Sequence, residues 1–284
     1  EFNREALLLD PGMITYFDPA GNQYARTFCH STLLISGGDQ LGGVQPFDVG
    51  FVDVLSTSGE QCPGKPGGID WVIADDSAVY AEAELFNRHL VFLRPDICIL
   101  YDRVITHKPE TLALNFTCLG PLSQETGPDG SPLFLSTTRQ NRLLLHTQAS
   151  APLTYQTGKW GTHWPQVPAY RLVRPTSAPS GACNFLSVLA AHRLEDVQPE
   201  ITPAGIPGWL GVSVARGGGE ETVCFRQAGG ENTLPGGIET DAGGFILRKA
   251  VGKLTGAAMW DGTYLRADGK TVLENPGKQG LCGI

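Results

Sequence analysis

His89-Leu-Val-Phe-Leu93, Arg94-Pro95-Asp96 and Ile97-Cys-Ile-Leu-Tyr-Asp-Arg-Val104 follow one another and form the clearest local pattern in the sequence. The first and third segments are rich in β-branched, aromatic and other apolar residues, which favour extended backbone. The middle segment supplies turn chemistry, because proline fixes φ and the aspartate side chain can bond to nearby backbone. These sixteen residues therefore predict a β-hairpin.

The same strand pattern continues along the chain. Short apolar runs recur at roughly ten-residue spacing and are bounded by Gly, Pro, Asn, Asp or Ser. Further strands are expected at 6–9, 32–35, 49–55, 79–85, 112–118, 133–136, 143–146, 170–173, 185–189, 210–214, 222–226 and 245–248. No window keeps a helical apolar pattern for three turns without a breaker, so helix should stay below about 10%. The predicted fold is all-β, a large antiparallel β-sandwich of two multi-stranded sheets.

The 284 residues are expected to form a single sandwich domain over 1–284, because β-sandwiches of this size often form one core. The region 217–284 is rich in glycine and predicts a C-terminal sub-sheet of short hairpins.

Composition narrows the choice of partners. The formal net charge is −8 and the sequence shows no Lys/Arg cluster, which argues against nucleic-acid binding. An acidic polysaccharide would have to be bound by a few well-placed Arg, Lys, Asn or His side chains. No stretch reaches the roughly 18–20 apolar residues of a membrane helix, so no membrane partner is expected.

The seven cysteines include no CxxC pair. Cys29, Cys98, Cys118, Cys183 and Cys224 lie in or beside apolar runs, where a free cysteine usually behaves as a small buried apolar residue. Cys62 and Cys282 lie in Gly/Pro-rich segments, and the sequence does not decide whether they form a disulfide.

The sequence contains no HExxH, GxSxG, Walker or GxGxxG signature. The most informative segment is an apolar run that ends at Asp10-Pro-Gly12, followed twenty residues later by His30 at the start of another run. If the two strands pair, a carboxylate and an imidazole share one sheet end, and both are ligands of ions such as zinc. Spacing alone more often indicates a turn-forming aspartate and a hydrogen-bonded strand histidine.

Several aromatic and basic residues have two interpretations. Tyr16, Tyr24 and Arg26 could line a cleft beside Asp10 and His30, or they could be packing residues with a local ion pair.

Trp160 and Trp164 could stack on sugar rings, or they could plug the space between sheets. Asn115-Phe116-Thr117 fits a glycosylation sequon, but its position inside an apolar run favours a buried strand.

The order of these N-terminal features resembles the start of the heparinase II/III-like C-terminal domain. The features are the Asp10-Pro-Gly12 run, Tyr16, Arg26-Thr27 shortly before His30-Ser31-Thr32, an apolar strand, and Gly37 to Gln40. The stretch from Arg88 to Arg103 is similar to a hairpin of the same family. The resemblance covers Leu7 to about Val104 and is only general beyond it, where Phe185–His192 fits best.

The resemblance implies a function. Members of the family join an N-terminal helical toroid to a β-sandwich and cleave uronic-acid polysaccharides by β-elimination. The expected function is therefore that of the C-terminal domain of a polysaccharide lyase on heparin/heparan-like or alginate-like glycans, in the periplasm or secreted. An acidic polysaccharide and the toroid are the expected partners. The alternative is a non-catalytic carbohydrate-binding or structural module.

The resemblance also implies a metal site and an incomplete catalytic set. In several members a zinc ion is held by an upstream His and by the residues that match Asp10 and His30. These two are therefore the expected ligands of zinc or another divalent ion. The upstream histidines and the toroid are not in this sequence, so the ligand set is expected to be incomplete and the main catalytic residues to be missing.

Overall fold

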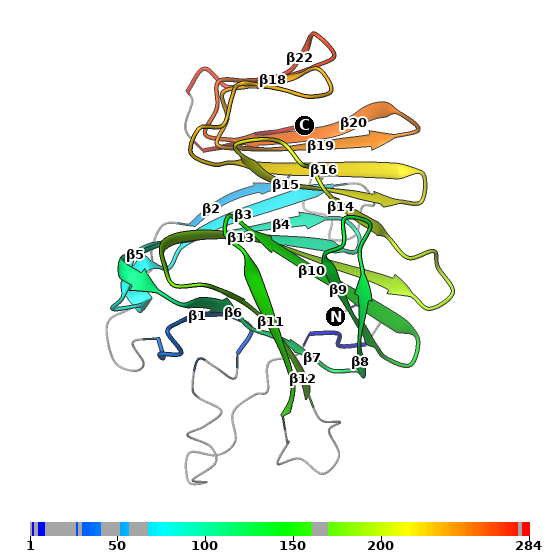
Figure 1. Ribbon diagram of the computed structural model, residues 1–284. Helices are drawn as coiled ribbons and strands as arrows, with labels where there is room; N and C mark the ends of the chain where they lie inside the picture. Colours follow the sequence, from blue (N-terminus) through cyan, green and yellow to red (C-terminus); the bar gives the residue numbers. More distant parts are fainter. Residues whose placement is uncertain are drawn as a thin grey trace.

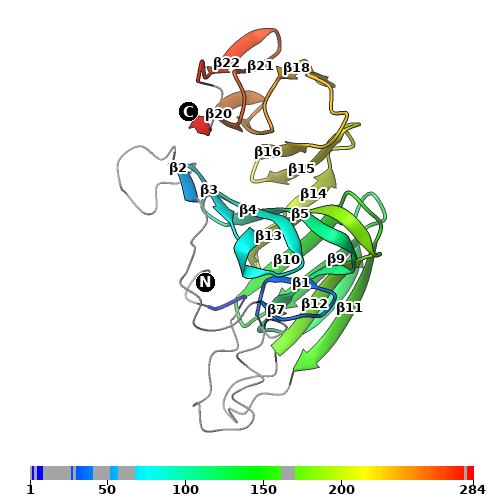
Figure 2. The same ribbon diagram turned by 90° about the vertical axis from the view of Figure 1, so that its left-hand side faces the viewer.

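The structure is a computed structural model that describes residues 2, 5–8, 27, 30–40, 52–56, 68–160, 170–277 and 280–284. These residues form four antiparallel sheets that are stacked as layers (Figures 1 and 2). They include no α-helix, and the helical turn Ser77–Val79 is of the 3-10 type. The prediction of an all-β, antiparallel fold with very little helix is confirmed.

The first two sheets are formed by the strands up to Arg193. The first sheet has the order β1-β6-β12-β11, with β7 also paired to β12. Its strands are β1 (Leu33–Ile35), β6 (Leu112–Leu114), β7 (Phe116–Cys118), β11 (Leu153–Trp160) and β12 (Tyr170–Ser177). The second sheet has the order β2-β3-β4-β5-β13-β10-β9-β8. Its strands are β2 (Val52–Ser56), β3 (Ile69–Asp75), β4 (Ala83–Leu93), β5 (Ile97–Glu110), β13 (Ser180–Arg193), β10 (Asn141–Ala149), β9 (Pro132–Thr137) and β8 (Leu122–Thr126).

The remaining strands form two further sheets, so the chain has four sheets in place of the two expected. The third sheet contains β14 (Glu200–Pro203), β15 (Trp209–Arg216), β16 (Gly219–Arg226), β19 (Gly244–Ala250), β20 (Lys253–Trp260) and β23 (Leu281–Gly283). The fourth contains β17 (Thr233–Leu234), β18 (Ile238–Thr240), β21 (Tyr264–Ala267) and β22 (Lys270–Glu274). The glycine-rich C-terminal region therefore supplies most of the two outer layers at the top of Figure 1.

The hairpin predicted at 89–104 is the centre of the second sheet. Strands β4 and β5 pair in a register that places Leu93 opposite Ile97 and Val91 opposite Ile99. The expected strand at 79–85 begins only at Ala83, since Ser77–Val79 forms the 3-10 turn. The cause is local, because the Asp75 carboxylate accepts hydrogen bonds from the Ser77 N–H (2.9 Å) and hydroxyl (2.5 Å).

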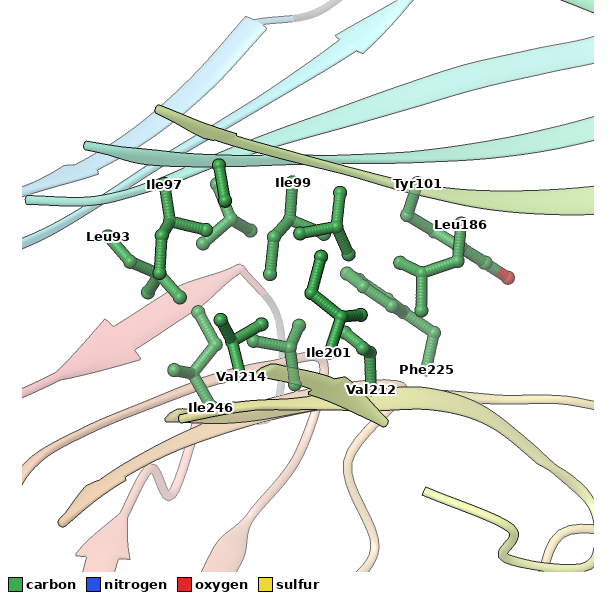
Figure 3. Close-up of a cluster of buried hydrophobic side chains, with 14 of the residues drawn as sticks. Leu93, Ile97, Ile99, Tyr101, Leu186, Ile201, Val212, Val214, Phe225 and Ile246 are labelled. Atoms are coloured by element: carbon green, nitrogen blue, oxygen red, sulfur yellow. The ribbon is translucent and has the colours of Figure 1, made fainter. Parts of the chain in front are cut away.

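Three apolar cores separate the four sheets. One core lies between the first and second sheets and includes Leu114 and Phe185. The next lies between the second and third sheets, where Ile97 and Ile99 meet Val212 and Val214 (Figure 3). The last lies between the third and fourth sheets. The second sheet is therefore covered on both faces.

Ion pairs join the second and third sheets beside the β4–β5 turn. Arg216 pairs with Asp96 of this turn and with Glu221 (3.3 Å). Arg248 also pairs with Glu221 (3.2 Å) and donates to the carbonyl oxygen of Gly68 (3.3 Å). Because Glu221 and Arg248 are buried, these charges lie in a poorly hydrated site, where Asp96 and Glu221 together balance the two guanidinium groups.

The described cysteines match the sequence interpretation. Cys118, Cys183 and Cys224 are buried, Cys98 and Cys282 are half-buried, and all five are free thiols. Burial raises the pKa of Cys118 and of Cys224 to about 12, so these thiols stay protonated and unreactive. Cys29 and Cys62 lie outside the described residues. In the described part of the chain, no helix is long and apolar enough to cross a membrane.

His89 is a fully buried histidine in the core between the second and third sheets. Its Nδ1 accepts a hydrogen bond from Trp71 Nε1 (3.2 Å), and its ring contacts Tyr101, Phe225 and Trp260. Burial lowers the pKa of His89 from its ordinary value to about 3, with a smaller contribution from Arg103. Protonation would also remove the acceptor that Trp71 uses.

The first prediction concerns acid stability. Between about pH 6.5 and pH 3, unfolded His89 binds a proton that the folded form does not, so the free energy of unfolding falls as the pH falls through this window. His89→Asn keeps an acceptor for Trp71 and cannot titrate. We expect the acid-dependent loss to be smaller in the variant, by up to roughly 4 kcal/mol. Urea unfolding of both proteins between about pH 7 and pH 4 measures the difference, and equal slopes would contradict the assignment.

Candidate functional site

Of the residues that the sequence placed at a site, the structure describes His30. Asp10, Tyr16, Tyr24, Arg26 and Trp164 lie outside the described residues. Trp160 ends strand β11, and its side chain also lies outside the description. The geometry around His30 can therefore be given, whereas the expected proximity of Asp10 and His30 stays a prediction.

His30 is half-buried just before β1 and is held by backbone contacts. Its N–H donates to the Thr27 carbonyl (3.1 Å), and its own carbonyl accepts from the Thr32 N–H (3.0 Å). Thr27 donates its N–H to Asp39 Oδ1 (3.0 Å) and accepts the Gln40 N–H at its hydroxyl (2.7 Å). These bonds fasten the segment before β1 to the segment after it.

The Tyr80 side chain also holds β1 and the segment that follows it in place. Its hydroxyl donates to the Leu33 carbonyl (2.7 Å), accepts from Gln40 Nε2 (2.9 Å) and lies 3.5 Å from the Thr32 hydroxyl. The side chain is buried, and burial raises the pKa of Tyr80. The phenol is therefore a structural hydrogen-bonding group that stays protonated near neutral pH.

Asn115 connects the His30 segment to the β11–β12 hairpin. The Asn115 N–H donates to the Thr32 carbonyl (2.9 Å), and the neighbouring Thr117 N–H donates to the Ser31 hydroxyl (3.2 Å). Asn115 separates β6 from β7, and its backbone N–H bonds to the Thr32 carbonyl at this point. Because Asn115 is 1% exposed, the sequon interpretation is wrong and the buried-strand interpretation is confirmed.

The Asn115 side chain in turn orients an arginine. Arg174 of β12 donates from Nε to Asn115 Oδ1 (2.7 Å) and from Nη1 to Gln156 Oε1 (3.3 Å). Gln156 is directly opposite Arg174 in the β11–β12 register. His30, Asn115 and Arg174 therefore belong to one hydrogen-bonded array that crosses the first sheet.

A pocket of about 320 Å³ lies between the first and second sheets beside this array. Ser31, Arg88, Asp96 and Asn115 are polar residues of its lining, and apolar side chains such as Leu90 and Leu100 form most of the remaining wall. Arg88 is held by a bidentate ion pair with the buried Asp102, with Nε–Oδ1 at 2.6 Å and Nη2–Oδ2 at 2.9 Å. This pair fixes the β4–β5 strands in place, since Arg88 and Asp102 are cross-strand partners.

The chemistry of the array suits binding more than bond cleavage. Its described members are amides, hydroxyls, one imidazole and one guanidinium, which are groups that hold hydroxyl and acidic substituents. Within the described residues no group of three or more His, Cys, Asp or Glu side chains could hold a metal ion.

The model of the family described as heparinase II/III-like, C-terminal matches residues 1–201. The chain belongs to this family. The match ends where the second sheet is complete and the third begins, so the His30 array and the β4–β5 hairpin lie within the family region of this heparinase II/III-like C-terminal chain.

Solved structures share the fold at low sequence identity. The heparan sulfate lyase HepC from Pedobacter heparinus is 16% identical with a TM-score of 0.53, and a heparinase III structure is 14% identical with a TM-score of 0.56. Each similarity covers 78% of this chain and 34% of the other chain. The heparinase II/III-like chain therefore spans about a third of the length of these enzymes. No curated protein sequence matches it.

Sequence reasoning missed Tyr80, Asn115, Arg174 and Gln156. Each lies in or beside a strand whose local pattern carries no sign of a site, and they come together only through pairing between distant segments.

The second prediction tests the anchoring role of Tyr80. Tyr80→Phe leaves the Leu33 carbonyl and the Gln40 amide without this partner, which should cost about 1–3 kcal/mol of unfolding free energy and increase amide exchange at 30–35. Tyr264→Phe is the control, because the half-buried Tyr264 hydroxyl makes no hydrogen bond within the described residues. Chemical denaturation and hydrogen exchange provide the measurements. Equal stability of Tyr80→Phe and wild type would show that the phenol anchors nothing.

Proposed function

We propose that this chain is the C-terminal β-sheet part of a polysaccharide lyase that cleaves uronic-acid glycans by β-elimination. The observation that carries the proposal is family membership over residues 1–201. The similarity in fold to heparan sulfate lyases supports it, as does the finding that the chain spans about a third of their length. On the same family basis, we place the protein in the periplasm or outside the cell.

In this proposal the chain contributes binding and orientation. β-Elimination requires neutralisation of the uronate carboxylate, removal of the C5 proton and protonation of the leaving oxygen. Ser31 in the pocket wall would hold sugar hydroxyl groups, and Arg174, which Asn115 orients on the neighbouring hairpin, would hold an acidic group of the glycan. The apolar wall of the pocket would pack against a sugar face. An N-terminal toroid domain would supply the base and the acid. Positioning of groups from both parts would then create the active site.

We also propose that Asp10 and His30 bind zinc or another divalent ion. Of the two expected metal ligands, His30 lies among the described residues and Asp10 lies outside them. No group of three or more possible ligands occurs in the described part of the chain. The ion, when bound, would fix the segment before β1 and add positive charge near the glycan. The binding roles proposed for Ser31 and Arg174 do not depend on this ion.

The competing proposal is a carbohydrate-binding module without catalysis. The bonds that orient Arg174 through Asn115 and Gln156 are compatible with it, because they suit ligand binding. The two proposals differ in what lies upstream in the gene. Roughly 300–400 further residues with a helical pattern would support the lyase, whereas a start codon beside Glu1 would support the module.

The third prediction is that the 284-residue chain alone will not cleave uronic-acid polysaccharides above background. Positioning by two domains is worth roughly 10⁵-fold or more in rate, and one wall of a cleft cannot supply it. The measurement is the absorbance of the unsaturated uronate product from heparan sulfate, heparin and alginate. The comparison is with the same chain joined to its upstream region, which should turn over. Clear turnover by the 284-residue chain that His30→Ala abolishes would locate the active site here instead.

The fourth prediction concerns the metal. The purified chain should bind zinc at no more than one ion per chain, and His30→Ala should remove most of it, because imidazole is one of only two expected ligands. Elemental analysis after dialysis against zinc measures the content. His107→Ala is the control, since His107 is exposed on β5. Equal zinc in the His30→Ala and wild-type chains would contradict the site.

A further inference from the structure

Arg174 differs from the other arginines that donate side-chain hydrogen bonds in the described part of the chain. Arg88 and Arg266 bind carboxylates, Arg216 and Arg248 bind both carboxylates and backbone carbonyls, and Arg226 binds three backbone carbonyls. Arg174 bonds only to the neutral amide oxygens of Asn115 and Gln156. Its charge therefore has no carboxylate partner among the described residues.

The environment of Arg174 makes this lack of a partner costly. The side chain is partly buried, and burial lowers the pKa of the Arg174 guanidinium with no nearby charge acting in the opposite direction. The two amides fix the plane of the guanidinium through Nε and Nη1. A guanidinium has five N–H groups, and three of those of Arg174 have no acceptor among the described residues and can donate to an external one. An oriented, partly desolvated guanidinium is suited to bind carboxylate or sulfate oxygens.

The same hairpin carries a second excess of positive charge. Lys159 of β11 is directly opposite Arg171 of β12, and neither forms an ion pair with a described carboxylate. Like charges opposite each other in a sheet destabilise it. Arg171 lies three strand positions from Arg174, so the Lys159–Arg171 pair projects from the opposite face of the hairpin and does not line the same site as Arg174. This local excess occurs in a chain whose net charge is −8.

We propose that Arg174, oriented by Asn115 and Gln156, is a binding residue for the acidic group of a glycan. The proposal rests on the proposed function for the glycan class and adds the residue that recognises its anionic group. Carboxylate and sulfate share the required chemistry, two or three oxygen acceptors with negative charge.

The decisive variant is Gln156→Glu, which places a carboxylate where Gln156 already accepts from Arg174. This internal ion pair should occupy the guanidinium, leave the fold intact and weaken glycan binding about 10-fold. Gln124→Glu is the matched control, because Gln124 is also exposed on an edge strand, β8, and changes the net charge equally. Arg174→Gln should weaken binding similarly.

The probes separate the anionic groups. Affinity of the 284-residue chain is measured by calorimetry with heparan sulfate, its unsulfated N-acetylated backbone, alginate, dextran sulfate and neutral dextran. Binding of unsulfated backbone and alginate identifies carboxylate recognition, and binding of dextran sulfate identifies sulfate recognition. Either result supports the proposal if Gln156→Glu weakens that binding about 10-fold. Melting curves confirm that each variant is folded.

Three results would overturn the proposal. They are wild-type affinity in folded Gln156→Glu and Arg174→Gln, equal loss of affinity in Gln124→Glu, or equal binding of neutral dextran. Lyase activity is a separate readout. A longer protein without turnover whose glycan binding still depends on Arg174 would refute the proposed lyase and leave this inference standing. An active lyase whose binding ignores Arg174 would do the reverse.

Discussion

The architecture depends on burying the second sheet on both faces. Along β5, Ile97 and Ile99 enter the core shared with the third sheet, whereas Cys98 and Leu100 pack on the side of the first sheet. A sheet with two apolar faces is stable only when a layer covers each face, and each covering sheet then has its own outer face to satisfy. The outer face of the third sheet is covered by the fourth sheet. The stack of four layers therefore follows from the composition of the central strands.

The local part of this arrangement was predictable from the sequence, and the number of layers was not. The hairpin at 89–104 has β-rich runs on both sides of turn residues, and the structure confirms it. The run Ile97-Cys98-Ile99-Leu100 lacks the alternation of a one-sided strand, which is the signal for two buried faces. The pairing of β5 with β13 joins residues about eighty positions apart. Such contacts depend on the whole chain, and no local pattern encodes them.

The candidate site also has one part that the sequence predicted and another that it did not. His30 was identified because its segment has an ordered set of neighbours in sequence, whereas Asn115 and Arg174 belong to strands that look like ordinary core strands. Asn115 even carries a misleading sequon. Its true role depends on lying between the Thr32 carbonyl and the Arg174 guanidinium, contacts that span 83 and 59 positions. The role of a residue that connects distant segments is therefore visible in the folded structure and not in the local sequence pattern.

Arg174 has no carboxylate partner among the described residues, and this is the strongest sign that the first sheet does more than cover the second. A sequence selected only for stability would gain from a carboxylate at position 156, since it would compensate a partly desolvated cation at no cost in packing. The chain uses carboxylates in this way at Asp102 and at Glu221. At Arg174 it uses amides, which orient the guanidinium without neutralising it. The structural ion pairs lie where the sheets must be held together, and the unneutralised cation lies on the hairpin of the outer sheet. Preserved charge with fixed orientation is the arrangement expected where the compensating anion comes from a ligand.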